Sequence, residues 1–304
     1  MQFNANNLSK RELELYITFL LKQNELIRKR IIRPIYRGES LANMCEKLNV
    51  EHKGAETNYE RLAEILFIVG DKSKRYFKDL DGFTLNDTDN SVFDKIMDYF
   101  KESIKNKNKG VQAFFENNSN LKIFFSTKQN KKIFSNALKP LNKIDKLAVR
   151  NYYLILLHQI SAINYRDKSH FVSASTKYDV AKTFSGLNKN KIDKTILHCW
   201  QPIKREYQII QKCGLPTYVS APYFYQKEIT IFGGIFPHFI SGLEITHSNL
   251  FFPNPNIFNN EITNSIFLDG FNINQSDFKT IIKKTNYKKS IISDGNETWE
   301  ENAN

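Results

Sequence analysis

The chain has 304 residues, of which 41% are hydrophobic and 13% aromatic, so its composition excludes a disordered protein and allows one or two hydrophobic cores. Lysine and arginine number 44 against 32 acids, and the net charge of +12 suits polyanionic partners such as nucleic acid, acidic proteins or nucleotide phosphates. The three cysteines and six histidines show neither disulfide nor metal-ligand spacing, so we expect no metal site.

The chain carries no recognisable targeting or membrane segment. Residues 1–21 lack the basic-then-apolar order and the small-residue cleavage site of a signal peptide. Charged residues interrupt the apolar runs, so no membrane-spanning helix is expected. We therefore expect a cytoplasmic protein, or one secreted into a host cell without a cleaved signal peptide.

A helix and a strand are the first two predicted elements. Ser9 and Glu12 form a capping box, and apolar residues recur at helical spacing from there to about residue 30. Pro34 disfavours helix both for itself and for the residue before it. Residues 31–37 are therefore predicted to form a strand that ends at Arg37.

Residues 55–165 have a different character, because successive helical patterns occur there with almost no strand signal. One apolar stripe begins at Tyr59 and another at Val92. Residues 145–163 are apolar nearly all round, which is typical of a buried central helix. Lysine-rich connectors separate these helices, and we interpret them as solvated loops rather than as a nucleic-acid patch.

Strand character returns after residue 165. The segments HFVSAS and TILHCW are predicted strands, and Thr176 with Asp179 forms a capping box for a short helix between them. A hairpin is predicted around the turn pair Gly233-Gly234, because β-branched and aromatic runs flank it. Gln226 and Glu228 are two apart on its first strand, so both side chains should face a common cleft.

These patterns divide the chain into four expected segments. Residues 1–54 hold the N-terminal helix and the first core strand, 55–165 form a helical insertion, and 166–250 complete the core. Residues 251–304 form a C-terminal segment whose acidic end, SDGNETWEENAN, is predicted to be a disordered tail.

Three motifs, in this order, resemble the arginine–serine–glutamate class of mono-ADP-ribosyltransferases, which includes many bacterial toxins and effectors. They are an arginine at a strand end, a Ser-x-Ser strand and a Gln-x-Glu strand: Arg37, Ser173 with Ser175, and Gln226 with Glu228. The Ala-x-x-Phe pattern of the short helix (Ala181 and Phe184) and the aromatic Tyr223 also match the family. The sequence departs from the family at Ala174, which replaces the usual threonine, and in the long stretch between Arg37 and Ser173, which predicts an inserted helical subdomain.

The resemblance implies an α+β fold: a split, two-sheet β core with flanking helices, interrupted by the large helical insertion. It also implies that NAD is the substrate. No Gly-x-Gly-x-x-Gly follows a strand, so NAD is not expected in a doubly wound dinucleotide-binding domain.

In this resemblance Glu228 is the catalytic carboxylate. It would hold the ribose 2′-hydroxyl and stabilise the oxocarbenium-like centre that forms when nicotinamide leaves. Arg37, with Gly38 beside it, would bind a phosphate of the dinucleotide through the planar guanidinium.

The remaining family positions imply supporting roles. Ser173 would orient the catalytic carboxylate, and Ser175 would line the same NAD-binding strand. Gln226 and Tyr223 would recognise the acceptor.

The acceptor and the biological setting stay open at this point. A neutral Gln226 suits an amide, a hydroxyl or a nucleic-acid base better than an arginine guanidinium, so we expect a macromolecular acceptor other than arginine. The alternatives are an NAD glycohydrolase that uses the same site with water, and a non-catalytic binding protein on the same fold. A toxin, an effector and a defence protein all fit, with an antitoxin or host regulator as a further candidate partner.

Overall fold

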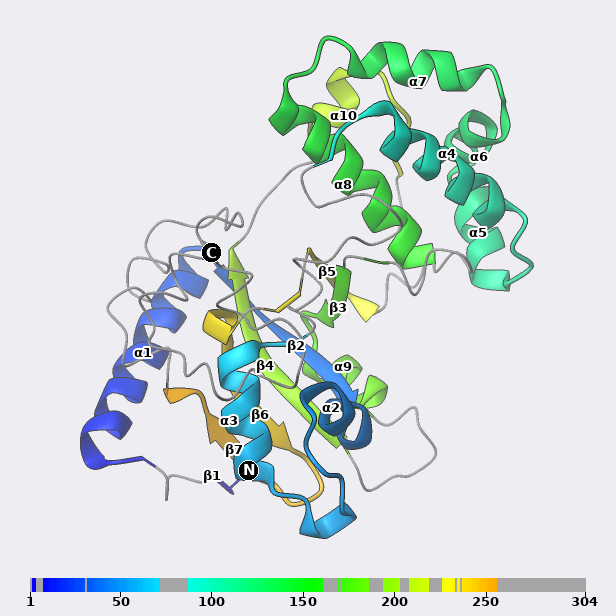
Figure 1. Cartoon of the computed structure of the whole chain (residues 1–304). Helices are drawn as coiled ribbons and strands as arrows, with labels where there is room; N and C mark the ends of the chain where they lie inside the picture. Colours follow the sequence, from blue (N-terminus) through cyan, green and yellow to red (C-terminus); the bar gives the residue numbers. More distant parts are fainter. Residues whose placement is uncertain are drawn as a thin grey trace. The chain divides into compact units, whose positions relative to one another are not determined.

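A computed structural model describes residues 2–3, 8–30, 32–71, 87–160, 169, 171–185, 194–202, 208–218, 226–232, 234–235 and 237–255. The chain divides into two compact units (Figure 1). Unit 1 comprises Met1–Lys74, Ser173–Ile203 and Gly233–Asn304, and unit 2 comprises Arg75–Val172 and Lys204–Phe232. Among the described residues, no helix has both the length and the apolar character needed to cross a membrane.

The fold is α+β, as predicted. The strands that the structure describes are β1 (Gln2–Phe3), β2 (Ile32–Ser40), β3 (Phe171–Ser175), β4 (Lys194–Pro202), β5 (Glu228–Phe232), β6 (Ile240–Ile245) and β7 (Leu250–Pro253). They follow the order β1-β7-β6-β4-β2-β3-β5 in one sheet, where a split, two-sheet core was expected. β1 runs parallel to β7, whereas β2 is antiparallel to β3 and β4, and β6 is antiparallel to β4 and β7.

Helix α1 (Lys10–Arg28) begins where the sequence predicts. The Ser9 hydroxyl accepts from the Glu12 backbone N–H at 3.3 Å, and a Glu12 carboxylate oxygen accepts from the Ser9 N–H at 2.7 Å. This reciprocal pair satisfies two of the N–H groups that a helix start leaves without intrahelical partners. Tyr16, Phe19 and Leu26 then form the buried face of α1.

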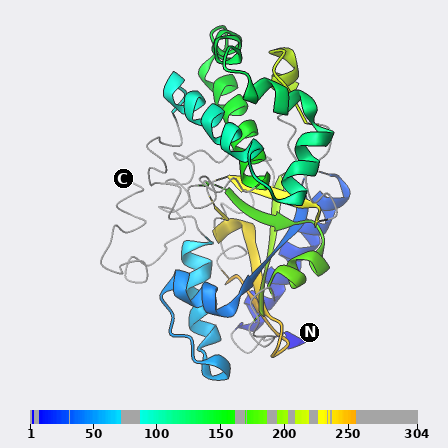
Figure 2. The ribbon, with the colours of Figure 1, turned by 90° about the vertical axis from the view of Figure 1, so that its right-hand side faces the viewer.

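Helices cover both faces of the sheet in unit 1 (Figure 2). Side chains alternate between faces along a strand, so Ile32 of β2 and Trp200 of β4 point to the face that α1 covers, where they pack with Phe251. Helix α9 (Tyr178–Phe184) lies on this face too, against Gly38. The opposite face, with Arg37, is covered by α2 (Leu41–Leu48) and α3 (Tyr59–Val69), which are joined through η2 (Gly54–Glu56).

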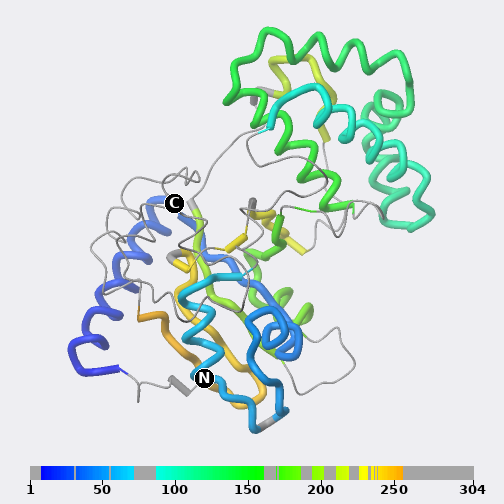
Figure 3. Tube along the Cα trace, in the orientation of Figure 1, coloured from blue at the N-terminus to red at the C-terminus, as the bar shows by residue number. Residues whose placement is uncertain are grey.

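Unit 2 is a helical bundle around an aromatic core (Figure 3). Its helices are α4 (Asn90–Ile104), α5 (Lys109–Asn117), α6 (Ser119–Ser126), α7 (Asn130–Leu138), α8 (Lys143–Ile160) and α10 (Gln208–Lys212). Phe100, Phe125, Phe134 and Tyr153 are fully buried and contact one another through stacked or edge-on rings. The prediction that the nearly all-apolar segment forms a buried central helix is confirmed by α8, in which Tyr153, Leu154 and Leu157 are inaccessible to solvent.

The unit boundaries differ from the segments expected from sequence. Helix α3 lies in unit 1 rather than in the helical insertion, and residues 204–232, with α10 and β5, belong to unit 2. The reason is burial: all but four of the eleven residues of α3 are buried, and α3 packs on α2, β6 and η6 (Pro237–Phe239).

The predicted hairpin at Gly233-Gly234 is wrong. β6 pairs with β4 on one side and with β7 on the other, so both its edges are occupied and it cannot pair with β5. Instead, Ile235 forms an isolated antiparallel bridge with Asp71. The glycine is still needed, because Gly234 has φ 138, a conformation that residues with a Cβ rarely adopt.

Helix α9 also departs from its prediction. Thr176 and Asp179 do not form its cap: the N-cap residue is Lys177, whose backbone N–H donates to Ser175 Oγ at 3.0 Å. Ala181 is buried as predicted, but the Phe184 side chain is 41% exposed.

Candidate functional site

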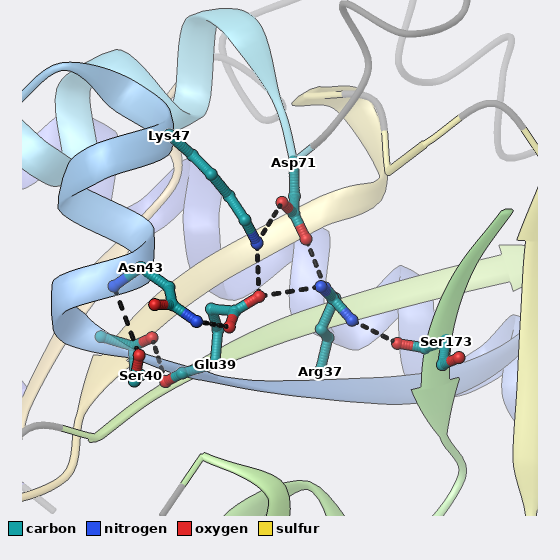
Figure 4. A network of polar contacts seen from close by, with 8 residues as sticks. Arg37, Glu39, Ser40, Asn43, Lys47, Asp71 and Ser173 are labelled. Atoms are coloured by element: carbon teal, nitrogen blue, oxygen red, sulfur yellow. Dashed lines mark hydrogen bonds and ion pairs between the residues drawn. The ribbon is translucent and has the colours of Figure 1, made fainter. Parts of the chain in front are cut away.

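The prediction that a strand ends at Arg37 is wrong, because β2 continues through Ser40. The Arg37 side chain is almost fully enclosed by unit 1 (Figure 4). It is 10% exposed, and each of its three nitrogens has a partner. Nε donates to an Asp71 carboxylate oxygen, Nη1 to the Ser173 carbonyl oxygen at 2.8 Å, and Nη2 to Glu39 Oε2 at 2.9 Å. Arg37 therefore ties together β2, β3 and the end of α3.

Lys47 of α2 completes a four-charge network. Its ammonium group pairs with Glu39 Oε2 and lies 3.7 Å from Asp71 Oδ1, so two cations alternate with two carboxylates. Asn43 Nδ2 donates to Glu39 Oε1 at 3.1 Å, on the helix that Ser40 caps. The network has no net charge, which allows these groups to be buried together.

The pKa values of this network reflect competition between burial and pairing. Burial alone would lower the pKa of Arg37, but the carboxylates of Asp71 and Glu39 outweigh it and raise that pKa. Burial alone would raise the pKa of Glu39, but Arg37 and Lys47 outweigh it and lower that pKa. Both groups are therefore held in their charged forms.

A guanidinium has five N–H donors, and the described partners of Arg37 use three of them. The two others are on Nη1 and Nη2, one on each. A guanidinium N–H can donate to a carboxylate or phosphate oxygen.

Gly38 packs against helix α9, on the face of the sheet opposite to Arg37. A Cβ at this position would overlap the Ala181 carbonyl group and would lie 2.8 Å from the Ser185 nitrogen. Close helix packing thus explains the glycine without a ligand.

The two serines of β3 have different surroundings. Ser173 is partly exposed, and its carbonyl oxygen accepts from Arg37. Ser175 is buried, and its hydroxyl accepts the Lys177 N–H in the turn that leads from β3 into α9. Ala174, where the family has threonine, is also buried.

Glu228 is the first residue of β5 and lies in unit 2, where a histidine of α8 lies close to its carboxylate. Glu228 Oε1 is 3.8 Å from His158 Nε2, and both side chains are largely buried, at 17% and 16% exposure. A second contact between the same elements joins Gln159 Nε2 to Thr230 Oγ1 at 3.5 Å. The expected convergence of Glu228 with Arg37 and Ser173 stays a prediction.

Ser169 sets the orientation of the His158 ring. Its hydroxyl oxygen accepts the Phe171 N–H at 3.2 Å and lies 2.7 Å from His158 Nδ1. When this hydroxyl donates to Nδ1, a neutral imidazole carries its proton on Nε2 and directs it toward Glu228. Sequence reasoning missed His158, although the signal was a lone histidine within the apolar run LILLHQI.

Gln226 does not lie on the strand with Glu228, contrary to the prediction. Strand β5 starts at Glu228, and Lys227 between the two residues has φ 47. Side chains two apart face the same way only when the intervening residue is extended. A lysine in the left-handed region is uncommon and costs about 1–3 kcal/mol, which marks this junction as strained. Tyr223 lies outside the described residues.

A second polar cluster lies on the α9 face of the sheet. Glu244 of β6 accepts from the Tyr178 hydroxyl at 2.7 Å and lies 2.7 Å from His198 Nε2. Burial alone would raise the pKa of Glu244, but its contacts with His198 and Tyr178 outweigh it and lower that pKa. The rings of Tyr36 and Phe251 meet His198 edge-on, so this cluster joins five elements of unit 1, namely β2, β4, β6, β7 and α9.

Sequence reasoning also missed Asp71, Glu39 and Lys47. Glu39 could have been found, because it is two residues from Arg37 on a strand and therefore shares its face. Asp71, only 1% exposed, follows the apolar run of α3, where a carboxylate requires a cationic partner.

Comparison of the chain with protein-family models, curated proteins and solved structures finds no match. Within the described ranges, histidine, cysteine, aspartate and glutamate form no group of three that could hold a metal ion.

Proposed function

We propose that the chain is an NAD-dependent mono-ADP-ribosyltransferase of the toxin or effector type, which transfers ADP-ribose to a macromolecule at a group other than arginine. The observation that carries the proposal is the contact between Arg37 and Ser173. These residues are 136 positions apart, yet Arg37 Nη1 donates to the Ser173 carbonyl at 2.8 Å. Two of the three family motifs thus lie side by side in unit 1, which we assign as an ADP-ribosyltransferase-like core.

Arg37 would bind NAD in the proposed reaction. Its contacts with Asp71, Glu39 and Ser173 fix the guanidinium, so it needs no reordering when a ligand arrives. The two N–H donors left on Nη1 and Nη2 would bind one phosphate of NAD, in the paired geometry that a lysine cannot provide.

Glu228 would act on the ribose. When nicotinamide leaves, positive charge develops on the ribose, and a carboxylate held beneath it stabilises that charge. His158, whose Nε2 lies 3.8 Å from Glu228 Oε1, would limit the positions open to this carboxylate by contact, since that distance is longer than a hydrogen bond. The acceptor loses a proton as the new glycosidic bond forms, and the neutral Gln226 favours an amide, hydroxyl or base nitrogen as that acceptor.

Incubation of the purified chain with labelled NAD and a cell lysate tests the proposal. Label that remains on macromolecules supports transfer, and nuclease or protease treatment identifies the acceptor class. Release of free ADP-ribose alone would instead support the glycohydrolase alternative.

The variants Glu228→Gln and Arg37→Lys should each lower the transfer rate, by roughly 10²–10³ for the carboxylate. Glu116→Gln, an exposed carboxylate of unit 2, is the matched control. Unchanged transfer in Glu228→Gln, with wild-type stability, would refute the assignment.

A further inference from the structure

The lysines of the chain are concentrated in one part of unit 2. Residues 105–146 contain ten lysines and two acids, so this segment of α5, α6, α7 and the start of α8 carries a net charge of +8 out of the total of +12. Eight of these lysines are exposed, and the other two are partly exposed. The excess positive charge of the protein is therefore a local property of this helical surface.

Few of these lysines are neutralised within unit 2. Among the described residues, Lys105 pairs with Glu102 at 2.8 Å and Lys131 with Asp94 at 2.7 Å, and no other lysine of this segment forms an ion pair. The two acids, Glu116 and Asp145, are too few to balance them. Such a surface attracts polyanions and releases their counterions on contact.

The inner faces of the same helices are packed in the core of unit 2. Phe115 of α5, Phe125 of α6 and Phe134 of α7 are buried in the aromatic core of unit 2. Insertion into a lipid surface requires an apolar helix face that is free to enter it. In residues 105–146 the exposed large hydrophobic side chains are three separate isoleucines, namely Ile123, Ile133 and Ile144. Isolated exposed residues of this kind are common on protein surfaces.

We propose that the lysine-rich surface formed by residues 105–146 binds nucleic acid through its phosphate backbone, which replaces our interpretation of its lysine-rich connectors as solvated loops. The segment contains no arginine, and the aromatic residues in it are buried or partly buried. The segment therefore offers no arginine to pair with guanine and no exposed aromatic ring to stack on bases, and we assign its lysines to phosphate contacts, which are independent of sequence. This inference goes beyond the proposed function, because it holds whether or not NAD is the substrate.

Fluorescence anisotropy with a 30-base-pair DNA and an RNA duplex of equal length tests the inference, in a titration of KCl. The full chain carrying Glu228→Gln is used, so that no modification accompanies binding. We expect the logarithm of the binding constant to fall linearly with the logarithm of the salt concentration, by about 0.9 for each DNA phosphate contacted.

Two matched triple variants locate the surface. Lys128→Gln, Lys132→Gln and Lys139→Gln together remove three charges from unit 2, and should weaken binding and reduce the salt slope by up to about three. Lys10→Gln, Lys29→Gln and Lys53→Gln remove the same charge from exposed positions of unit 1, and should leave the slope unchanged. Equal effects of the two triples would overturn the proposal, as would failure of the Glu228→Gln chain with all its lysines to bind either duplex at 50 mM KCl.

Vesicles with 30% anionic lipid test the alternative that the lysine-rich surface binds a membrane. Binding to vesicles but not to either duplex would replace nucleic acid with a membrane surface and refute the inference. Binding is measured without NAD, so this experiment can refute nucleic-acid binding without bearing on the proposed transferase activity. Failure of one proposal is therefore distinguishable from failure of the other.

Discussion

Asp71 and Ile235 exchange both backbone hydrogen bonds, each of 2.9 Å, and so bridge the end of α3 and the segment before β6. This bridge fixes the backbone of Asp71 next to the Arg37 guanidinium. The carboxylate is thus positioned by main-chain pairing, while the arginine is positioned by the strand β2. Neither group depends on the other for its place, which makes their ion pair a preorganised part of unit 1.

Replacing Arg37 with alanine should destabilise the protein strongly. The change leaves the carboxylates of Asp71 and Glu39 buried with only Lys47 as a cation, and breaking a buried ion pair typically costs about 3–5 kcal/mol. Urea unfolding followed by circular dichroism measures the loss. Lys53→Ala removes an exposed pair with Glu51 and should cost about 0–1 kcal/mol. Equal losses in the two variants would contradict the burial that we assign to the network.

Replacing Gly38 with alanine should cost about 1–3 kcal/mol or more, because the new methyl group meets backbone atoms of α9 that cannot move independently. Gly242→Ala provides a comparison, since its methyl group would meet mainly the ring of Phe251, together with the Phe252 carbonyl oxygen at 2.8 Å. Adding Phe251→Leu should recover part of the stability of Gly242→Ala. No second-site side-chain change should rescue Gly38→Ala, and thermal melting temperatures report both outcomes.

Acid should unfold the protein partly through Glu39. Its pKa is lowered in the folded state, so its stabilising contribution is fully present above the unfolded carboxyl pKa of about 4.3. That contribution is lost as the pH falls through the lowered folded-state value. Glu39→Gln should therefore be less stable than the wild type at pH 7, and the two urea midpoints should converge below about pH 4. A gap that stays constant from pH 7 to pH 3 would show that Glu39 does not titrate in this way.

His158 should affect catalysis more than stability if it positions Glu228. His158→Ala should lower kcat by about tenfold, or about 1.4 kcal/mol, with a smaller change in KM. His158→Gln should retain more activity, because its side chain places polar atoms near the position of Nε2 and fills more of the imidazole's volume than alanine does. Gln159→Ala removes the neighbouring contact of α8 with β5 and serves as the structural control. A parallel loss of kcat in the alanine variants of both residues would assign His158 a packing role only.

Local patterns were sufficient to predict much of the fold. The capping box at Ser9, the strands β2, β3 and β4 and the apolar stripes of α3 and α4 follow from spacing within a dozen residues, and the structure contains all of them. Periodicity reports which face of an element is buried, and that information is local.

The errors arose where distant segments decide the outcome. Gly233-Gly234 has the composition of a hairpin turn, but the edges of β6 are taken by β4 and β7, which no local pattern reveals. Gln-x-Glu was treated as continuous strand, whereas Lys227 adopts a left-handed conformation that its sequence does not demand. In the same way, the partners of Arg37 at Asp71 and Ser173 are 34 and 136 positions away, and only the folded chain brings them together.

The order of synthesis has a consequence for the central strand. Thr195 of β4 donates to the Glu39 carbonyl of β2 although the two residues are 156 positions apart. At 5–20 residues per second, a ribosome needs roughly 8–30 s to make the missing partner strand after β2 has emerged. During that interval the backbone edge of β2 is unpaired and open to wrong pairing, so chaperone supply should influence the yield of this protein more than its final stability would suggest.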